Sequence, residues 1–397
     1  MSDPGTTPVA SRPAPGSTAS LRTANQRRVV DLILARGRVT QAEIARETGL
    51  ASGTVSSIVR ELAAAAILTT VPGAGRRGTS VELGRGAGLV AAFDFGHSHV
   101  AVAVGDVAGR VLAEYTEPLP PSYDDTLGLG QATALLDELL AGLHATRAEV
   151  RNVGMGLPCP IADGVVMSSA IMPAWVGLNA RDLTESRLGI GVQLDNDANL
   201  GALGEYRRGA GRGHANVVFV KVSSGVGAGL ILDHKVFRGT HGTAGEVGHL
   251  TLDEQGPLCR CGSRGCLEAY AATGPALTMM AEQLAGNEQP LQIDAVITAA
   301  QQGNVAARRV FEDAGLHLGW GLATITNLLN PGVIVVGGDM SHAGDLLLDS
   351  ARVGLRRHAL AGAASVPIHV AALGDRASLV GALMLAIDAT DLLSEAG

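Results

Sequence analysis

The sequence predicts a chain of two unlike parts. One is a small head of three helices and a β-hairpin, and the other is a larger α/β body built from two similar lobes. Three observations lead to this fold class. Helix-start signals and a short glycine-containing turn occur near the N-terminus. An apolar strand followed by a glycine-rich turn occurs twice farther on. A group of His and Cys residues follows the second of these turns.

The length and charge of the chain agree with this division. Its 397 residues suffice for two or three domains, each with its own core. Residues 1–86 hold 11 Arg, no Lys and 6 acidic residues, a net charge of +5. The remainder holds 19 basic and 32 acidic residues, a net charge of −13. This asymmetry indicates that nucleic acid meets the head while the body stays off the phosphates.

The N-terminal segment and the cysteine content indicate the compartment. Residues 1–20 are rich in Pro, Ser, Thr and Gly, which is typical of a disordered tail rather than a signal peptide. No stretch is long and apolar enough to span a membrane. The chain has four Cys, and three of them crowd together in a spacing that suits a metal better than a disulfide framework. We therefore expect a cytoplasmic protein with no membrane partner.

Residues 21–85 are expected to form the head. Thr23 with Gln26, and Thr40 with Glu43, match the capping-box pattern, in which two side chains satisfy the unpaired N–H groups at a helix start. Two helices should follow these signals. The first is expected to stop at Arg36-Gly37 and the second to run over residues 41–48, each followed by a glycine.

A third helix is expected to begin near Ser52, after the short turn of residues 49–51. A turn of this kind joins the two crossed helices of a helix-turn-helix. The third helix places an apolar stripe inside, formed by Val55, Ile58, Val59 and Leu62. The outer residues are small or polar, as a helix that enters the DNA major groove requires: Gly53, Thr54, Ser56, Ser57 and Arg60.

A β-hairpin with a basic tip is expected to follow the third helix. Its strands are residues 67–71 and 80–83, and its tip carries Arg76 and Arg77, which we assign to phosphate contacts. An ordinary three-helix bundle with an incidentally basic surface could show any one of these features. Their combination favours a winged helix-turn-helix that binds double-stranded operator DNA.

The body begins with a buried strand over residues 89–95, followed by strands at 100–104 and 111–115. A helix over about 126–145, a strand ending at Gly156 and a helix from about Asn199 complete one unit. The pattern then recurs with strands at 217–222, 230–233 and 333–336. Two such lobes would face each other across a cleft, each with a glycine-rich turn whose N–H groups can approach phosphate.

The most specific motif is a set of one His and three Cys: His249, Cys259, Cys261 and Cys266. Three thiolates and an imidazole can close a tetrahedral zinc site, and a closed site is structural because it leaves no position for water. Cys159 lies outside this motif and is expected to be a core residue.

With this block, the sequence resembles the ROK family of repressors, open reading frames and kinases, from residue 21 onward. The resemblance implies the duplicated actin-like, sugar-kinase fold, which is ribonuclease H-like. It places a small α/β lobe at residues 88–200 with a C-terminal helix at 376–393. A large α/β lobe with the zinc motif then spans residues 201–375.

The resemblance also implies a sugar site. The family's sugar-binding positions correspond here to Asn196, Asp197, Glu246, His249 and Glu268. A carboxylate or an amide can form hydrogen bonds with two adjacent hydroxyls at once, and zinc would fix the imidazole in one tautomer. Asp197 matches the general base of the family's kinases, which takes the proton of the sugar hydroxyl as phosphate arrives. The alternative role of Asp197 is a helix cap beside Asn199.

The first phosphate loop departs from the kinase pattern. Kinases of the family carry Asp-x-Gly-Gly-Thr, whereas this chain has His97 where the second Gly would be. A bulky imidazole should obstruct the triphosphate or force φ into a poorer region, which counts against ATP and Mg²⁺ as cofactors. The phosphate-loop positions are Asp94, Gly96, Ser98, Ser224, Gly225, Gly227, Gly337 and Gly338.

Two functions of different class therefore remain open. One is a sugar-responsive transcription regulator, of repressor type by the family's leaning, that binds a sugar or sugar phosphate as its effector. The other is an active ATP-dependent sugar kinase with a DNA-binding appendage. The head favours the first, and His97 counts against the second. A homodimer or dimer of dimers is expected, because helix-turn-helix proteins commonly read paired half-sites.

Overall fold

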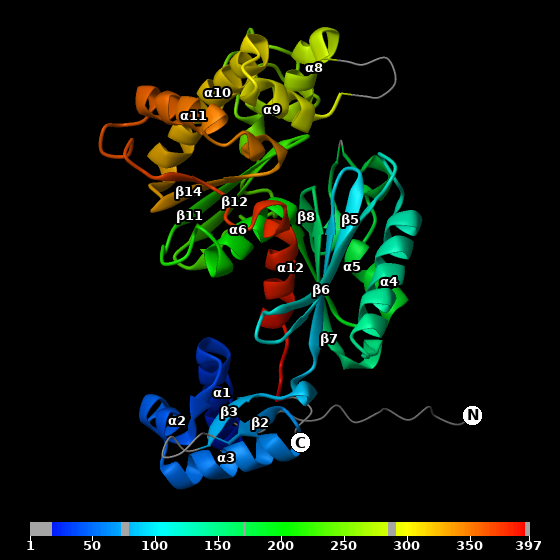
Figure 1. Ribbon diagram of the computed structural model, residues 1–397, viewed down its shortest axis with the longest axis vertical. Coiled ribbons are helices and arrows are strands. Elements are labelled where there is room, and N and C mark those ends of the chain that lie inside the picture. The colour runs from blue at the N-terminus through cyan, green and yellow to red at the C-terminus, as the bar shows by residue number, and fades with distance from the viewer. Residues whose placement is uncertain (1–17, 73–78, 170, 285–290, 394–397) are drawn as a thin grey trace, which may run out of the picture. The chain divides into compact units, whose positions relative to one another are not determined.

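The computed structural model describes residues 18–72, 79–169, 171–284 and 291–393 (Figure 1). The chain divides into two compact units. The first unit comprises residues 1–89 with the short segments 106–110 and 390–397, and the second comprises residues 90–105 and 111–389. Among the described residues, no helix combines the length and the apolar character that crossing a membrane requires.

The first unit contains the expected helices and hairpin. Its elements, in the described residues, are α1 (Thr18–Arg36), β1 (Val39–Thr40), α2 (Gln41–Thr48), α3 (Ser52–Ala64), β2 (Leu68–Val71) and β3 (Ser80–Leu83). Strand β3 pairs antiparallel with β2, as the predicted hairpin requires. The short strand β1 pairs with the other edge of β3 and was not predicted.

The start of α2 and the ends of α1 and α2 lie where the sequence places them. Thr40 Oγ1 accepts the N–H of Glu43 at 3.2 Å, and a Glu43 carboxylate oxygen accepts the N–H of Thr40 at 2.8 Å. Gly37 has φ of 72° and Gly49 has φ of 71°, a left-handed conformation that glycine adopts without strain. These three signals fix the helix-turn-helix.

The expected helix start at Thr23 was wrong. Helix α1 already includes Thr18, so Thr23 lies inside it. No Gly or Pro occurs between Thr18 and Thr23, and the intervening Ser, Leu and Arg are compatible with a helix. A capping-box pattern inside such a segment therefore does not by itself interrupt the helix.

The first sheet of the second unit has the strand order β10-β7-β4-β5-β6. Its strands are β4 (Leu89–Phe95), β5 (His99–Asp106), β6 (Val111–Pro118), β7 (Val150–Leu157) and β10 (Val192–Asn196). Helices α4 (Asp125–Gly142), α5 (Ala180–Leu188) and α6 (Asp197–Arg208) accompany it, and β8 (Ile161–Ala162) pairs with β9 (Val165–Val166) in a separate hairpin.

The second sheet has the strand order β13-β12-β11-β14-β15. Its strands are β11 (Val217–Val222), β12 (Val226–Leu232), β13 (Lys235–Val236), β14 (Val333–Gly337) and β15 (Ile368–Val370). The helices of this half are α7 (Glu268–Ala271), α8 (Thr273–Leu284), α9 (Ile293–Gln301), α10 (Val305–Leu329) and α11 (Asp345–His358), and α12 (Ala377–Asp388) follows the last strand.

The two sheets have the same topology. In each, three consecutive strands are followed by a helical segment, a strand, a helix, a strand and a helix, and the helical segment is α4 alone in the first half and α7–α10 in the second. The fourth strand adds beside the first, and the fifth adds beside the fourth. The added strands run parallel to their neighbours: β10 pairs with β7, β14 with β11, and β15 with β14. This confirms the predicted duplication. Helix α12, red in Figure 1, packs against α6 and against β7.

Alternation along β11 determines what each side chain faces. Val218, Val220 and Val222 belong to the core formed with α7–α11, whereas Val217 and Phe219 belong to the core formed with α6. Because side chains alternate between the two faces of a strand, Lys221 shares the α6 face with Val217 and Phe219.

Several element bounds differ from the expectation for local reasons. Helix α6 begins at Asp197 rather than Asn199, because Asn196 caps it. The expected lobe boundary at residues 200–201 thus falls inside α6. Strand β12 begins at Val226 rather than Leu230, and a Cβ on Gly229 would collide with the Ala198 carbonyl of α6. Here glycine serves close packing of a helix on a strand.

The C-terminal helix is also shorter than expected. It ends at Asp388, not at residue 393. Beyond it, the Asp391 carboxylate accepts the N–H of Leu393 at 3.1 Å, a local side chain to backbone bond that competes with helix continuation.

Candidate functional sites: the head and the cleft

The third helix of the head, α3, presents most of its predicted outer residues to solvent. Gly53, Thr54 and Arg60 are exposed, and Ser56 and Ser57 are half-buried. The predicted inner stripe is buried throughout: Val55, Ile58, Val59 and Leu62. The exposed end of α3 therefore offers small residues and one cation, which is a surface that can approach base edges.

Ser57 has a partner inside the head. Its hydroxyl donates to Glu61 at 3.1 Å, and Glu61 also accepts from Arg22 and from Gln26, each at 3.2 Å. The Arg22 hydrogen bond and the Ser57 hydroxyl hold the pKa of the Glu61 carboxyl below its ordinary value. These bonds join α3 to α1, so Ser57 contributes to the helix packing that presents α3.

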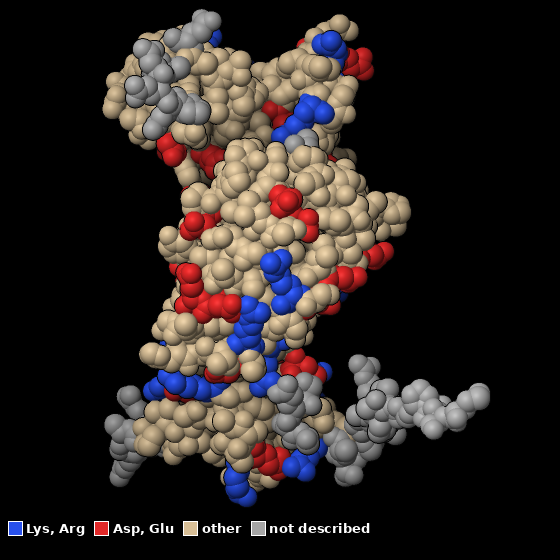
Figure 2. All heavy atoms as spheres, turned by 90° about the vertical axis from the view of Figure 1, so that its right-hand side faces the viewer, with Lys and Arg blue, Asp and Glu red and all other residues tan. Residues whose placement is uncertain are grey.

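The arginines of the head differ in their pairing. Arg36 contacts Glu47 at 3.0 Å and Arg38 contacts Glu82 at 2.7 Å. Arg60 is exposed and has no ion pair within the described residues. Arg76 and Arg77, the predicted tip of the hairpin, lie outside the described residues. On the face shown in Figure 2, blue basic side chains cover more of the lower end, where the head lies, than red acidic ones.

The four predicted metal ligands come together. The ligand atoms of His249, Cys259, Cys261 and Cys266 all lie within 4.8 Å of one another. The Sγ atoms of Cys261 and Cys266 are 3.8 Å apart, and Cys259 Sγ is 3.8 Å from His249 Nδ1. All four Cys of the chain are free thiols. The fourth, Cys159, is buried away from this cluster, as expected.

The loop that carries the cysteines is folded on itself by backbone bonds. Cys259 N–H donates to the Ser263 carbonyl at 2.8 Å, and Gly262 N–H donates to the Cys259 carbonyl at 3.0 Å. Gly265 has φ of 63°, and a Cβ there would collide with the Asp253 carbonyl. Only glycine fits this position without displacement of the loop.

The donor set and its spacing fit a tetrahedral ion. With metal–sulfur bonds of about 2.3 Å, two sulfurs of a zinc tetrahedron lie roughly 3.8 Å apart. The Cys261–Cys266 separation has that value. His249 turns Nδ1 toward the sulfurs and Nε2 toward Glu246, whose carboxylate is 4.0 Å away. A metal on Nδ1 would leave Nε2 as the N–H that faces Glu246.

Asn196 is the cap of helix α6. Its Oδ1 accepts the N–H groups of Ala198 at 2.8 Å and Asn199 at 3.3 Å, and its Nδ2 donates to the Cys159 carbonyl at 3.2 Å. The sequence allowed a cap at Asp197 as the alternative to a general base, but the cap is Asn196. Asp197 is the first helical residue.

Both carboxylate oxygens of Asp197 are engaged within the protein. Oδ1 accepts the Ala198 N–H at 2.8 Å, and Oδ2 is 2.7 Å from the ammonium of Lys221. Burial acts to lower the pKa of Lys221, but Asp197 and Asp94 outweigh it and raise that pKa, so the ammonium keeps its charge. The candidate base therefore lies in an ion pair that joins α6 to β11.

Glu268 is engaged in a similar way. Arg260 donates Nε to Oε1 at 2.7 Å and NH2 to Oε2 at 2.9 Å, and Val226 N–H donates to Oε2 at 3.0 Å.

Glu246 is the least engaged of the five candidate sugar ligands, with 38% of its side chain exposed. Burial raises the pKa of Glu246, His249 opposes the shift, and Asp197 and Glu268 add to it. Glu246, His249 and Glu268 thus lie together beside the cysteine loop, and Asn196 and Asp197 lie at the start of α6.

The first phosphate loop is a tight turn between β4 and β5. Gly96 N–H donates to the His99 carbonyl at 2.9 Å, and the Tyr123 hydroxyl donates to the Gly96 carbonyl at 2.9 Å. His97 and Ser98 are exposed, and φ of His97 is not positive, so the expected backbone strain at His97 is absent. The imidazole against Gly96 is that of His99.

The second phosphate loop is covered by a cation. Arg260 NH2 donates to the Ser224 carbonyl at 3.0 Å, and a Cβ on Gly225 would lie 2.6 Å from that nitrogen. Gly227 lies within β12, and Gly337 ends β14. A Cβ on Gly337 would meet the Phe219 ring at 2.7 Å, and Gly338, with φ of 82°, lies against Ser223.

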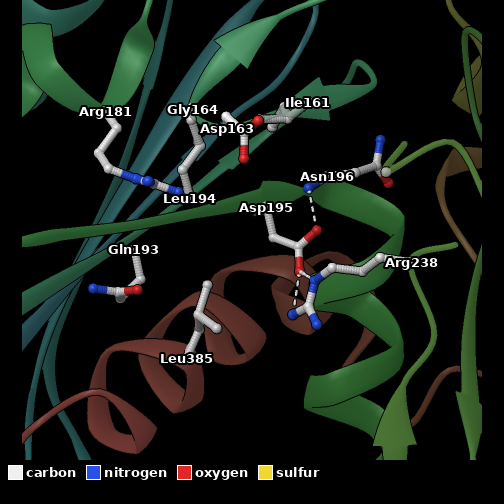
Figure 3. A pocket seen from close by; sticks show the side chains of 11 residues that line it. Ile161, Asp163, Gly164, Arg181, Gln193, Leu194, Asp195, Asn196, Arg238 and Leu385 are labelled. Atoms are coloured by element: carbon white, nitrogen blue, oxygen red, sulfur yellow. Dashed lines mark hydrogen bonds and ion pairs between the residues drawn. The ribbon is translucent and has the colours of Figure 1, made fainter. Parts of the chain in front are cut away.

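A polar cavity of about 260 Å³ adjoins the candidate sugar site and shares Asn196 with it (Figure 3). On its wall, the Asp195 carboxylate accepts from the Asn196 N–H at 2.8 Å and from Arg238, whose closest nitrogen is 2.7 Å away. Asn199 donates to the same carboxylate at 2.8 Å. These bonds fix the start of α6, where Asn196 is the cap and Asp197 is the first helical residue.

Lys221 and Arg260 were not predicted from the sequence as parts of the site. A signal for Lys221 was present, because it is one of two Lys in the chain and interrupts an otherwise apolar strand. Arg260 lies between two cysteines of the metal motif, but its reach to Ser224 depends on the folded loop. Neither contact can be inferred from spacing alone.

These features define a two-lobed actin-like body joined to a winged helix-turn-helix. The ROK family model matches residues 90–389, and a model described as winged helix-turn-helix DNA-binding matches residues 22–65. The chain belongs to the ROK family.

Similar proteins include both regulators and kinases. A putative xylose repressor of Caldicellulosiruptor sp. is 27% identical over 96% of this chain and 98% of its own length. The structure of a ROK family glucokinase from Streptomyces griseus, in complex with glucose and AMPPNP, is 31% identical, with a TM-score of 0.66 over 76% of this chain and 100% of that chain. A ROK family transcriptional regulator, a homolog of the E. coli MLC protein, has a TM-score of 0.76 over 92% of this chain and 96% of that chain, at 23% identity.

Proposed function

We propose that this chain is a sugar-responsive, DNA-binding transcriptional repressor of carbohydrate metabolism. The observation that carries the proposal is the union, in one chain, of a winged helix-turn-helix and a ROK body. The similarity to a putative xylose repressor extends over both parts. In this proposal α3 enters the major groove of operator DNA with Gly53, Thr54, Ser56 and Arg60, while Arg76 and Arg77 contact phosphates. Ser57 supports α3 through Glu61.

The effector in this proposal is a sugar bound in the cleft of the body. Glu246 and the Nε2–H of His249 offer an acceptor and a donor to adjacent hydroxyls, and Asn196, Asp197 and Glu268 complete the site. The three engaged residues can still bind hydroxyls. Asn196 keeps a second Nδ2–H to donate, and both oxygens of Asp197 and Oε1 of Glu268 each accept a single N–H bond, which leaves a lone pair. Burial of several acceptors favours a neutral, hydroxyl-rich ligand.

Zinc is the metal we assign to His249, Cys259, Cys261 and Cys266. Soft thiolates with one imidazole in tetrahedral spacing select zinc over the oxygen-preferring Mg²⁺ and Ca²⁺. The ion would hold the cysteine loop and orient His249 toward the sugar. It would leave no open position for a reacting water, so its role is structural.

Sugar binding can alter DNA affinity only if the ligand prefers one of two conformations of the protein. Allosteric couplings of this kind are typically about 1–3 kcal/mol. We propose a homodimer, because paired half-sites are the usual targets of helix-turn-helix proteins. Such a repressor acts where the DNA is, which agrees with the cytoplasmic location expected from the sequence.

The competing function is an ATP-dependent sugar kinase, which the similarity to the glucokinase favours. The ion pair of Asp197 with Lys221 counts against it, because a general base must be able to accept the proton of the sugar hydroxyl. Both functions predict sugar binding, so a binding assay alone does not separate them.

The test is a mobility-shift assay of the purified full chain on the DNA upstream of its own gene. It is run with a panel of pentoses, hexoses and their phosphates, and a phosphorylation assay with ATP and Mg²⁺ is run in parallel on the same panel. We expect one sugar to change DNA affinity and none to be phosphorylated. Phosphorylation of a sugar with no effect of any sugar on DNA affinity would establish the kinase instead.

A further inference from the structure

We infer that the ammonium of Lys221 is a built-in counter-ion that takes the place of a divalent cation between Asp94 and Asp197. Phosphoryl transfer in a kinase fold requires Mg²⁺ at the phosphates, held in part by carboxylates. The residues of this chain do not fit that ion. The counter-ion lies in the same cleft as the proposed sugar site. It explains how that cleft can bind a ligand without phosphoryl transfer.

Lys221 is directed to this position by its strand. It pairs with Gly227 of β12 on one side and with Gly337 of β14 on the other. Both neighbours are glycines without a side chain. Of these three paired residues, only Lys221 therefore extends a side chain toward the N-terminus of α6. Its ammonium is 2.7 Å from Asp197 Oδ2. Side-chain exposure is 24% for Lys221 and 10% for Asp197.

Asp94 is the second carboxylate of the cluster. It is the penultimate residue of β4, is 4% exposed, and its Oδ1 has no hydrogen-bond partner within the described residues. A Cβ on Gly156 would lie 3.1 Å from that oxygen and 2.8 Å from Leu200 of α6, which places Asp94 beside the same helix. Burial raises the pKa of Asp94, while Lys221 opposes the shift and Asp197 adds to it.

The charge balance follows from these positions. Without Lys221 the two carboxylates would carry a charge of −2 when ionised, which a single Mg²⁺ would neutralise. With Lys221 the cluster carries −1, and a carboxylate oxygen that a metal would need is already bound. A divalent ion that entered would also have to face the ammonium at close range, which is repulsive in a partly buried site.

The experiment measures Mn²⁺ binding by electron paramagnetic resonance, because Mn²⁺ prefers the oxygen ligands that Mg²⁺ also uses. The zinc-loaded full chain is compared with Lys221→Met, Lys221→Arg and the double variant Lys221→Met with Asp94→Asn. We expect Lys221→Met to bind Mn²⁺ at least tenfold more tightly than the wild type. Lys221→Arg keeps the charge and should show no gain, and the double variant should lose the gain.

A folded Lys221→Met protein with no gain in Mn²⁺ affinity would overturn the inference. Should Lys221→Met fail to fold, the wild type and Asp94→Asn carry the test. Equal Mn²⁺ affinity in these two supports the inference, and wild-type binding that Asp94→Asn weakens tenfold overturns it. The measurement uses neither DNA nor sugar, so its failure is distinguishable from failure of the repressor function.

Discussion

Arg260 donates two parallel hydrogen bonds to Glu268, from Nε to Oε1 at 2.7 Å and from NH2 to Oε2 at 2.9 Å. The same NH2 group reaches the Ser224 carbonyl at 3.0 Å. One side chain of the cysteine loop thus holds both a candidate sugar ligand and the second glycine-rich turn. The planar fork of arginine suits this arrangement, and lysine could not reproduce both bonds.

Replacement of Arg260 by Met should therefore destabilise the body. Glu268 is 9% exposed and would lose two charged hydrogen bonds, for an expected loss of about 1–3 kcal/mol in the free energy of unfolding. Denaturant unfolding of zinc-loaded protein measures it. Arg309→Met is the matched control, since Arg309 is 72% exposed and its ion pairs should contribute less than about 1 kcal/mol. Equal losses in the two variants would contradict the role of Arg260.

The metal cluster predicts one zinc per chain. Cys261→Ser should lose that zinc and the sugar response together, because the metal orients His249 at the sugar site. Metal analysis by mass spectrometry gives the content. Cys159→Ala is the control, because Cys159 lies outside the cluster and should leave the zinc content unchanged. Full zinc in Cys261→Ser would disprove the ligand set.

Arg60 should contribute to DNA affinity. It is exposed on α3 and has no ion pair within the described residues, so its guanidinium is available to DNA. We expect Arg60→Ala to weaken operator binding by about 1–3 kcal/mol if it contacts a base edge, as measured by fluorescence anisotropy. If Arg60 instead contacts a phosphate, the variant should reduce the slope of log binding constant against log salt concentration by about one. Unchanged affinity and salt slope would remove Arg60 from the interface, with Arg309→Ala of the body as control.

His342 should make the stability of the body depend on pH. Burial acts to lower the pKa of His342, but Asp375 at 2.9 Å and Asp294 at 3.8 Å, together with Asp339, outweigh it and raise that pKa above its ordinary 6.5. A raised folded-state pKa stabilises the protein below the unfolded value, and this contribution is lost as pH rises through the folded value. His342→Gln should thus lower the melting temperature at pH 5.5–6.5 more than at pH 8.5. A deficit independent of pH would contradict this assignment.

The periodic parts of the fold were predictable from the sequence. The turn at Gly49, the Thr40 capping box and the apolar stripe of α3 are local patterns, and the structure has them where they were expected. The His and Cys spacing indicated a cluster in the same way. Local signals succeed here because the interactions that they describe are also local.

Contacts between segments far apart in the chain were not predictable. The Lys221–Asp197 ion pair depends on the packing of α6 across β11, and the Arg260 contact with Ser224 depends on how the cysteine loop closes. The backbone strain expected at His97 is also absent. The sequence could not show that His97 points to solvent while His99 lies against Gly96.

We propose that sugar binding in the body and DNA binding by the head are coupled. Thermodynamic linkage requires the coupling to be reciprocal, so operator DNA must change sugar affinity by the same factor as sugar changes DNA affinity. Calorimetric titration of the effector into the free protein and into its DNA complex measures this factor. We predict a loss of sugar affinity of about 5–150-fold on the complex, equal to the loss of DNA affinity with saturating sugar. Equal sugar affinity with and without DNA would contradict the account.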